Sequence, residues 1–157
     1  MSIGVHTDAS LQLPKSQSGV FVFLFSQRGT RIPLMWRSSR QPLATISTLA
    51  SETVAMHEGV QYAMAITELL RDRTMYVWTD HQFTITAGNR GWSAALAYLS
   101  RAIGLRFASI ADLTELGALK IAYVESESNL ADFMTKPLDK DALRRAALAI
   151  GLQFEEA

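Results

Sequence analysis

The stretch MYVWTDHQ, residues 75–82, decides the fold of this chain because an apolar run stops abruptly at a carboxylate. Residues 75–79 favour a buried strand, and Asp80 stands where such a strand opens to solvent. A second copy of the pattern, VHTD, lies at residues 5–8 and also ends at Thr-Asp. Two strands that end in the same dipeptide predict that Asp8 and Asp80 share one site.

The composition is that of an ordinary globular domain. The 157 residues are 48% hydrophobic and 19% charged, and this length fits a single domain over residues 1–157. The absence of cysteine excludes disulfides, thiol nucleophiles and cysteine-ligated metals. No apolar run approaches the roughly 20 residues that cross a bilayer, and no basic start precedes an apolar block. We therefore expect an intracellular protein, cytoplasmic or nuclear, with no secretion signal and no membrane partner.

The charged residues are unevenly distributed along the chain. The formal net charge is zero, which argues against a polycation that coats nucleic acid. Residues 9–51, however, contain no acidic residue and five basic ones: Lys15, Arg28, Arg31, Arg37 and Arg40. A solvated hairpin without a partner explains this segment as well as a surface that contacts phosphates does.

The strand pattern predicts a mixed sheet. Alternation and turn residues place strands at 3–8, 19–25, 32–37, 74–80 and 119–124. The first three form an antiparallel meander, since only short turns separate them. The strand at 74–80 follows a helical crossover and is expected to lie parallel to the first strand. The fold class is therefore α/β, with a five-stranded sheet that combines a meander with two parallel strands and is flanked by helices.

Apolar spacing and capping residues also predict the helices. They are expected from Ser47-Thr48 to about Arg71, over 92–103, over 105–116, and from Asp139 or Asp141 through Ile150. The glycines at 88 and 91 are interpreted as a break after the strand at 74–80, and Gly104 as a break between two helices. A short helix is expected near Leu130.

Four acidic residues stand out from this arrangement. Asp8 and Asp80 end strands, Glu52 lies on the same helical face as the small residues Ala55 and Gly59, and Asp132 begins the short helix. Four gathered carboxylates would repel one another without a cation. Oxygen ligands select Mg²⁺, with Mn²⁺ as the alternative, and a pair of such ions suits phosphodiester hydrolysis. Plain capping roles for these acids are the alternative interpretation.

Several motifs resemble a known family. TDAS at residues 7–10 and TDHQF at 79–83 are similar to TDGS and TDSQY of ribonuclease H. The chain resembles most the ribonuclease H domain of Ty1/copia-type retrotransposon polyproteins. NLADFMTKPL at 129–138 is nearly that family's NLADIFTKPL, while SQSG at 16–19 and residues 36–47 are similar to its STSG and WSSKKQPTVALS. The blocks keep their order from about residue 4 to residue 151.

The resemblance implies an endoribonuclease that hydrolyses the RNA strand of RNA–DNA hybrids with two metal ions and serves retrotransposon reverse transcription. The family's metal-binding carboxylates match Asp8, Glu52, Asp80 and Asp132. The implied partners are an RNA–DNA hybrid and a reverse transcriptase domain, attached covalently or not. Lys15, Arg37, Arg40, His81 and Asn129 are the candidate substrate-binding residues.

The sequence also departs from the family. His81 stands where the family has asparagine, and residues 92–116 lack its usual histidines and basic residues. Two other functions therefore stay open. One is a catalytically silent domain that binds hybrids, and the other is a nuclease or transposase that acts on DNA from the same scaffold. Lys136, just after the last motif aspartate, is expected on a solvated face.

Overall fold

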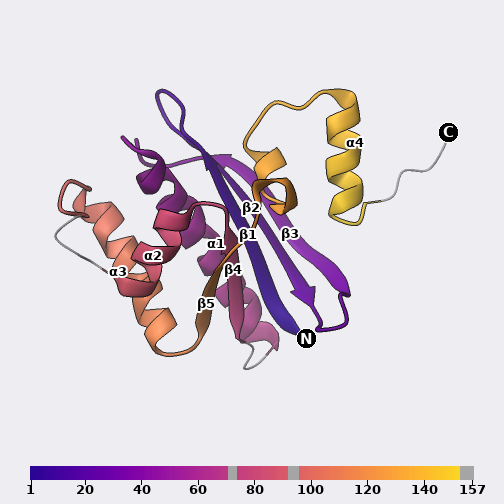
Figure 1. Ribbon diagram of the computed structural model, residues 1–157, viewed down its shortest axis with the longest axis horizontal. Helices are drawn as coiled ribbons and strands as arrows, with labels where there is room; N and C mark the ends of the chain where they lie inside the picture. Colours follow the sequence, from indigo (N-terminus) through magenta and orange to yellow (C-terminus); the bar gives the residue numbers. More distant parts are fainter. Residues whose placement is uncertain (71–73, 92–95, 153–157) are drawn as a thin grey trace.

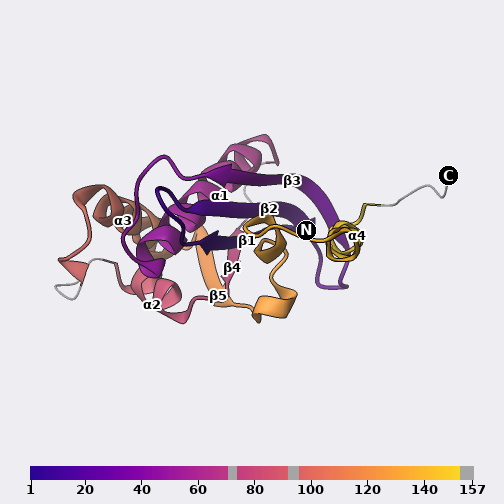
Figure 2. The same cartoon turned by 90° about the horizontal axis from the view of Figure 1, so that it is seen from above.

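The computed structural model describes residues 1–70, 74–91 and 96–152. Within these ranges the strands are β1 Ser2–Ser10, β2 Gln17–Phe25, β3 Arg31–Arg40, β4 Met75–Thr79 and β5 Leu119–Tyr123. The α-helices are α1 Thr48–Leu70, α2 Gln82–Arg90, α3 Arg101–Glu115 and α4 Lys140–Ala149. Two short 3₁₀ turns span Ser126–Ser128 and Asp132–Met134. Helix α4 lies apart from the other three helices in both views (Figures 1 and 2).

The strands form one mixed sheet in the order β3-β2-β1-β4-β5. The β1–β2 and β2–β3 pairs are antiparallel, and the β1–β4 and β4–β5 pairs are parallel. The predicted α/β fold, a meander joined to two parallel strands, is therefore confirmed. Strand β1 continues two residues past its predicted end at Asp8, because Ala9 and Ser10 still pair with β2.

Helix α1 packs its apolar face onto the sheet. Met56 and Val60 lie in one buried cluster with Val5, Val22 and Val77 from three strands. Each such side chain contributes roughly 1.5–3 kcal/mol when it leaves water. This layer fixes the position of α1 relative to β1 and β4, and these three elements carry the acidic residues.

Gly59 sets how closely α1 approaches β1. A Cβ atom at this position would lie 2.8 Å from Thr7 Cγ2 and 2.9 Å from Val5 Cγ1, which is too close for either side chain to stay in place. Glycine costs the helix up to about 1 kcal/mol relative to alanine. The close contact with the sheet explains why a glycine occupies this helical position.

The face of the sheet opposite α1 is aromatic. Phe21 and Phe23 of β2 are buried there with Leu130 and Ile150, and Trp78 of β4 packs against them. Leu130 belongs to the segment after β5, and Ile150 follows α4. These two connections cover part of the aromatic face.

Helix α2 is absent from the sequence prediction, which places a break at residues 88–91. The helix forms because His81 caps it: the ring Nδ1 accepts the backbone N–H of Thr84 at 3.2 Å. Gly88 lies inside the helix, where a Cβ atom would meet Ile121 Cδ1 at 2.7 Å. Tight packing on β5 therefore explains this glycine, and the predicted break is wrong. The helix ends at Gly91, which has a positive φ of 72°.

The prediction of two helices at 92–103 and 105–116 is wrong for the described residues. Helix α3 begins at Arg101 and runs without a break through Gly104 to Glu115, while residues 92–95 lie outside the described residues. Burial of Ile103, Phe107 and Ile110 holds this helix together. Their packing outweighs the cost of about 1 kcal/mol for one internal glycine.

The caps of the other helices match their sequence signals. Ser47 Oγ accepts the N–H of Ala50 at 3.2 Å at the start of α1. Of the two starts expected for the last helix, Asp139 is the cap, since its Oδ1 accepts the N–H of Ala142 at 2.8 Å. None of the helices in the described ranges combines the length and hydropathy that a bilayer span requires.

Candidate functional site

Three carboxylates from three separate elements lie together at one edge of the sheet. Asp8 belongs to β1, Asp80 directly follows β4, and Glu52 lies in the first turns of α1. One oxygen from each of the three side chains lies within 4.8 Å of the other two. We call these three residues the acid cluster.

The parallel pairing of β1 with β4 brings the two aspartates together. The last paired residues are His6 and Trp78, and each aspartate stands two positions further along its own strand. Asp8 and Asp80 therefore lie at the same end of the strand pair, close to each other.

Glu52 reaches the acid cluster from a buried position. Its side chain is 3% exposed, and Oε1 accepts the backbone N–H of Ala9 at 3.2 Å. The other oxygen, Oε2, is buried and has no hydrogen-bond partner in the described part of the chain. An unsatisfied buried carboxylate oxygen is costly unless a cation or a donor meets it.

Burial and mutual repulsion raise the pKa of two of these acids. For Glu52, burial raises the pKa well above its usual range, and the charges of Asp8 and Asp80 add to the effect. For Asp8, which is 5% exposed, burial also raises the pKa, and a hydrogen bond from Thr135 partly opposes it. The acid cluster therefore carries more negative charge than its surroundings compensate.

Asp132, the fourth predicted ligand, lies at the margin of this group. Its charge contributes to the raised pKa of Asp8 and of Glu52. Its carboxylate is not among the three that lie within 4.8 Å. Asp132 Oδ1 instead forms a salt bridge with Lys136, four residues later. Lys136 is exposed, as expected, but it has this specific partner.

Two hydroxyl residues that the sequence prediction does not include hold the aspartates. Thr135 Oγ1 donates to Asp8 Oδ2 at 2.5 Å, and the threonine is only 2% exposed. Ser126 Oγ donates to Asp80 Oδ2 at 2.5 Å. Thr135 follows Asp132 by three positions in the most specific motif, which is the one sequence signal that points to it.

His81 has a structural task in addition to any catalytic one. Its Nδ1 lies 2.7 Å from Thr84 Oγ1 and accepts the N–H of the same residue, so it caps α2 directly beside Asp80. Burial lowers the pKa of His81, and the charge of Asp80 partly opposes this. The neutral ring then carries its proton on Nε2, since Nδ1 is an acceptor.

Asn129 lies beneath the site and is not on its surface. It is 3% exposed, and its Nδ2 donates to the carbonyl of Thr7 at 3.0 Å. Its Oδ1 accepts the N–H of Ala131 at 3.1 Å. Both ends of the amide are used within the fold, so Asn129 ties the segment before Asp132 to β1.

The three basic candidates lie outside the acid cluster. Lys15 Nζ donates to the carbonyl of Pro42 at 2.9 Å. The Arg37 guanidinium lies 5.7 Å from the centre of the Tyr62 ring. Arg37 and Arg40 are exposed on β3, which is an edge strand of the sheet. These residues offer exposed positive charge, and none of them contacts a carboxylate of the acid cluster.

The acid cluster fits a divalent cation with oxygen ligands. All of its donors are carboxylate oxygens, which Mg²⁺ and Mn²⁺ prefer over nitrogen or sulfur. The unpartnered Oε2 of Glu52 and the uncompensated charge are the two features that such an ion would relieve. Zinc is disfavoured, because no cysteine exists in the chain and no histidine belongs to the cluster among the described residues.

Comparisons by sequence find no relatives, since no protein-family model and no curated protein matches the chain. Comparison of the fold with solved structures finds similar structures. An RNase H1 isolated from compost by a metagenomic approach matches with a TM-score of 0.63 at 18% identity, over 92% of this chain and 97% of that one. The same enzyme solved in complex with an RNA/DNA hybrid matches with a TM-score of 0.62 at 16% identity, over 92% of this chain and 99% of the other.

Similar structures also come from an archaeon and a retrovirus. RNase H1 of Halobacterium salinarum has a TM-score of 0.57 at 14% identity, covering 92% of this chain and 99% of its own. The RNase H domain of prototype foamy virus has a TM-score of 0.58 at 15% identity, with 94% of this chain and 95% of that domain covered. At these identities the likeness concerns the fold, and this chain has the ribonuclease H-like fold that its motifs predict.

Proposed function

We propose that this chain is an endoribonuclease that hydrolyses the RNA strand of RNA–DNA hybrids with two Mg²⁺ ions. The observation that carries the proposal is the acid cluster: three carboxylates within 4.8 Å, at the carboxyl ends of parallel strands in a ribonuclease H-like fold. Ligands of open α/β sheets bind at this edge. The products would be a 5′-phosphate and a 3′-hydroxyl.

Asp8, Glu52 and Asp80 are the residues that would hold the ions, and Asp132 would join them on exchanging its contact with Lys136. When bound, Mg²⁺ supplies the charge that makes water nucleophilic and stabilises the leaving oxygen of a phosphodiester. The hydrogen bonds from Thr135 and Ser126 hold Asp8 and Asp80 in place. These fixed carboxylates spare the site from reorganising during the reaction.

A similar structure and the exposed basic residues of this chain favour an RNA–DNA hybrid as the substrate. The similar compost RNase H1 has been solved in complex with an RNA/DNA hybrid. In this chain, Lys15, Arg37, Arg40 and His81 are the candidates for contacts with the phosphates of either strand, while Asn129 supports the site from below. Discrimination for RNA would come from contacts to the 2′-hydroxyl, which distinguishes the two sugars.

We further propose that the domain serves reverse transcription in a retrotransposon, in the cytoplasm or nucleus and beside a reverse transcriptase domain. Two observations favour this setting. The motif at residues 129–138 resembles that of Ty1/copia polyproteins. The fold also matches part of the foamy virus protease–reverse transcriptase, with a TM-score of 0.57 over 85% of this chain and 20% of that one.

The test is a cleavage assay with three labelled substrates: an RNA–DNA hybrid, duplex DNA and duplex RNA, each with and without Mg²⁺. We expect cleavage of the RNA strand of the hybrid alone, and only with the ion. Asp80→Asn should abolish this cleavage, and Asp112→Asn on the exposed face of α3 should not. Circular dichroism and thermal melting of both variants check that they fold.

The outcomes separate the proposal from the two other functions. Preferential cleavage of duplex DNA would assign the site to a DNA-directed nuclease. Binding of the hybrid without hydrolysis, at every concentration of Mg²⁺ or Mn²⁺, would make the domain catalytically silent. If folded Asp80→Asn cleaves the hybrid as fast as the parent, the acid cluster is not the catalytic site.

A further inference from the structure

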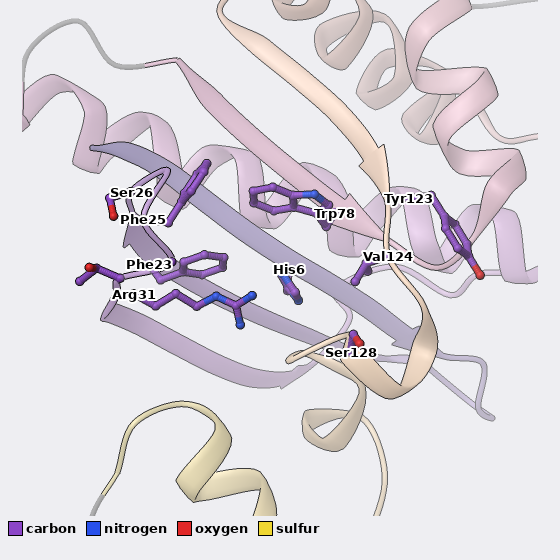
Figure 3. A pocket seen from close by; sticks show the side chains of 11 residues that line it. His6, Phe23, Phe25, Ser26, Arg31, Trp78, Tyr123, Val124 and Ser128 are labelled. Carbon is purple, nitrogen blue, oxygen red and sulfur yellow. The ribbon is translucent and has the colours of Figure 1, made fainter.

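A pocket of about 280 Å³ opens on the aromatic face of the sheet, opposite α1 (Figure 3). Residues of all five strands line it, together with the β2–β3 turn and the segment after β5. We call it the aromatic pocket, and its main lining residues are His6, Phe23, Phe25, Arg31, Trp78 and Ser128. Its volume is at the lower limit for small-molecule sites, which suits a single ring system with one substituent.

Aromatic rings form the walls of the pocket. Phe23 and Trp78 lie nearly parallel, with ring centroids 6.0 Å apart and an interplanar angle of 17°. Phe25 meets Trp78 edge to face at 5.3 Å. A planar ligand that enters here finds flat faces and ring edges, the geometry in which aromatic groups attract one another.

Arg31 brings a positive charge to the pocket. Its guanidinium carbon lies 5.6 Å from the centre of the Phe23 ring, a cation–π contact that holds the side chain at the pocket wall (Figure 3). None of the eleven lining residues is acidic. In the described part of the chain Arg31 forms no salt bridge, so its charge is open to an anion.

His6 brings a buried imidazole ring to the pocket. It is 4% exposed, and its ring centroid lies 5.3 Å from that of Phe23 and 5.5 Å from that of Trp78. Its Nδ1 accepts the N–H of Leu130 at 2.9 Å, so the neutral ring carries its proton on Nε2. The pocket therefore combines aromatic walls with the Arg31 guanidinium, and no carboxylate lines it.

The aromatic pocket is separate from the acid cluster. The segment after β5 runs between them: Ser126 donates to Asp80 on one side, while Ser128 lines the pocket on the other. Leu130 then binds His6 through its backbone. A ligand in the pocket would contact this segment without entering the acid cluster.

We propose that the aromatic pocket binds a planar aromatic ring that bears one anionic group, with the ring against the half-buried Phe25 and Trp78 and the anion on Arg31. A nucleoside monophosphate has this chemistry, with a base and a phosphate. A phenylalanine carboxylate, as at the end of a peptide, has it as well. The proposal does not depend on nuclease activity, because it uses none of the carboxylates of the acid cluster.

The test follows the imidazole signals of the three histidines by ¹⁵N–¹H NMR during titration with adenosine 5′-monophosphate and, separately, with N-acetylphenylalanine. Adenosine alone and inorganic phosphate alone are the single-part probes. We expect at least one of the two complete ligands to shift the His6 signals while leaving those of His57 unchanged. The complete ligand that binds more tightly identifies the source, nucleotide or peptide.

Arg31→Ala should weaken this binding about tenfold or more, since a charge-assisted hydrogen bond to the anion is lost. Arg28→Ala is the matched control, because it removes an exposed arginine three residues before Arg31, in the β2–β3 turn, that does not line the pocket. Equal effects of the two variants would overturn the proposal. It would also be overturned if neither complete ligand shifts His6, or if phosphate alone binds as tightly as the complete ligand.

Discussion

The acid cluster and the aromatic pocket use residues two positions apart on β1 and at the end of β4. The ligands proposed for the two sites have opposite charges. Strand β1 supplies His6 to the pocket and Asp8 to the cluster. Strand β4 supplies Trp78 to the pocket, and Asp80, directly after β4, belongs to the cluster. Two residues along a strand correspond to roughly 7 Å.

The difference between the two sites comes from what covers each pair. Asp8 and Asp80 stand beyond the last residues that pair β1 with β4, beside the buried carboxylate of Glu52. His6 and Trp78 lie one step deeper, among phenylalanines and under Arg31. On these two parallel strands, a shift of two residues thus separates a site suited to a cation from a site suited to an anion.

The largest effect is expected for Glu52→Gln. Loss of one carboxylate should slow hybrid cleavage roughly 1,000-fold, because several kcal/mol of charge stabilisation are lost and each 1.36 kcal/mol is tenfold in rate. The same change should stabilise the metal-free protein, since it removes a buried charge that Asp8 and Asp80 repel. Single-turnover cleavage and urea unfolding without metal measure the two effects.

The Asp112→Asn variant is the control for Glu52→Gln, since it removes one exposed carboxylate from α3. It should leave both the cleavage rate and the unfolding free energy near those of the parent. A Glu52→Gln protein that is less stable than the parent without metal would contradict the picture of an uncompensated acid cluster.

The second prediction concerns His6 of the aromatic pocket and the dependence of the unfolding free energy on pH. Burial first, and then the charge of Arg31, lower the pKa of His6 to about 4, while the Asn129 side chain opposes this in part. Below pH 6.5 the unfolded chain takes up a proton on His6 that the folded protein does not. The folded protein therefore loses unfolding free energy as the pH falls from 6.5 to 4. The loss should be about 3 kcal/mol.

His6→Asn isolates this effect, because the Asn Oδ1 can replace Nδ1 as the acceptor for Leu130 and does not titrate. Urea unfolding of both proteins at pH 6.5 and pH 4 gives the difference, in which the contributions of Asp8 and Glu52 cancel. Parallel loss of stability in the parent and in His6→Asn would show that His6 is not responsible.

Long periodic elements and short motifs could be predicted from the sequence. The apolar spacing of α1 locates Glu52 on its sheet-facing side, and the repeated Thr-Asp ending brings Asp8 and Asp80 to one edge. These predictions succeed because they depend on local periodicity and on the geometry of parallel strands. The same reasoning finds the mixed sheet.

Features set by contacts between distant residues could not be predicted. Thr135 donates a hydrogen bond to Asp8, 127 positions away in the sequence, and no local pattern predicts such a pair. The break assigned at Gly88 fails because the glycine is there for packing against Ile121. The aromatic pocket arises only when the β2–β3 turn places Arg31 beside a ring of the neighbouring strand.

The third prediction tests this long-range hydrogen bond. Thr135→Val removes the hydroxyl that donates to Asp8 and should cost about 2 kcal/mol of unfolding free energy at pH 7, as is usual for a hydrogen bond to a charged group. Thr135→Ser keeps the donor and should stay much closer to the parent. If the valine variant is as stable as the serine variant in urea unfolding, the hydroxyl does not stabilise Asp8.

The smallest expected effect is stabilisation by the ion itself. Mg²⁺ at ten times its dissociation constant should raise the unfolding free energy by about 1.4 kcal/mol at pH 7.5. The gain should shrink towards pH 5, because Asp8 and Glu52 have raised pKa values and protons then compete with the ion. Arg31→Ala should show the same gain as the parent, and Asp8→Asn should lose it, since only the acid cluster takes the cation. Urea unfolding with and without Mg²⁺, at pH 7.5 and pH 5, measures the gain for each protein. If Asp8→Asn keeps a gain that is equal at both pH values, the ion binds elsewhere.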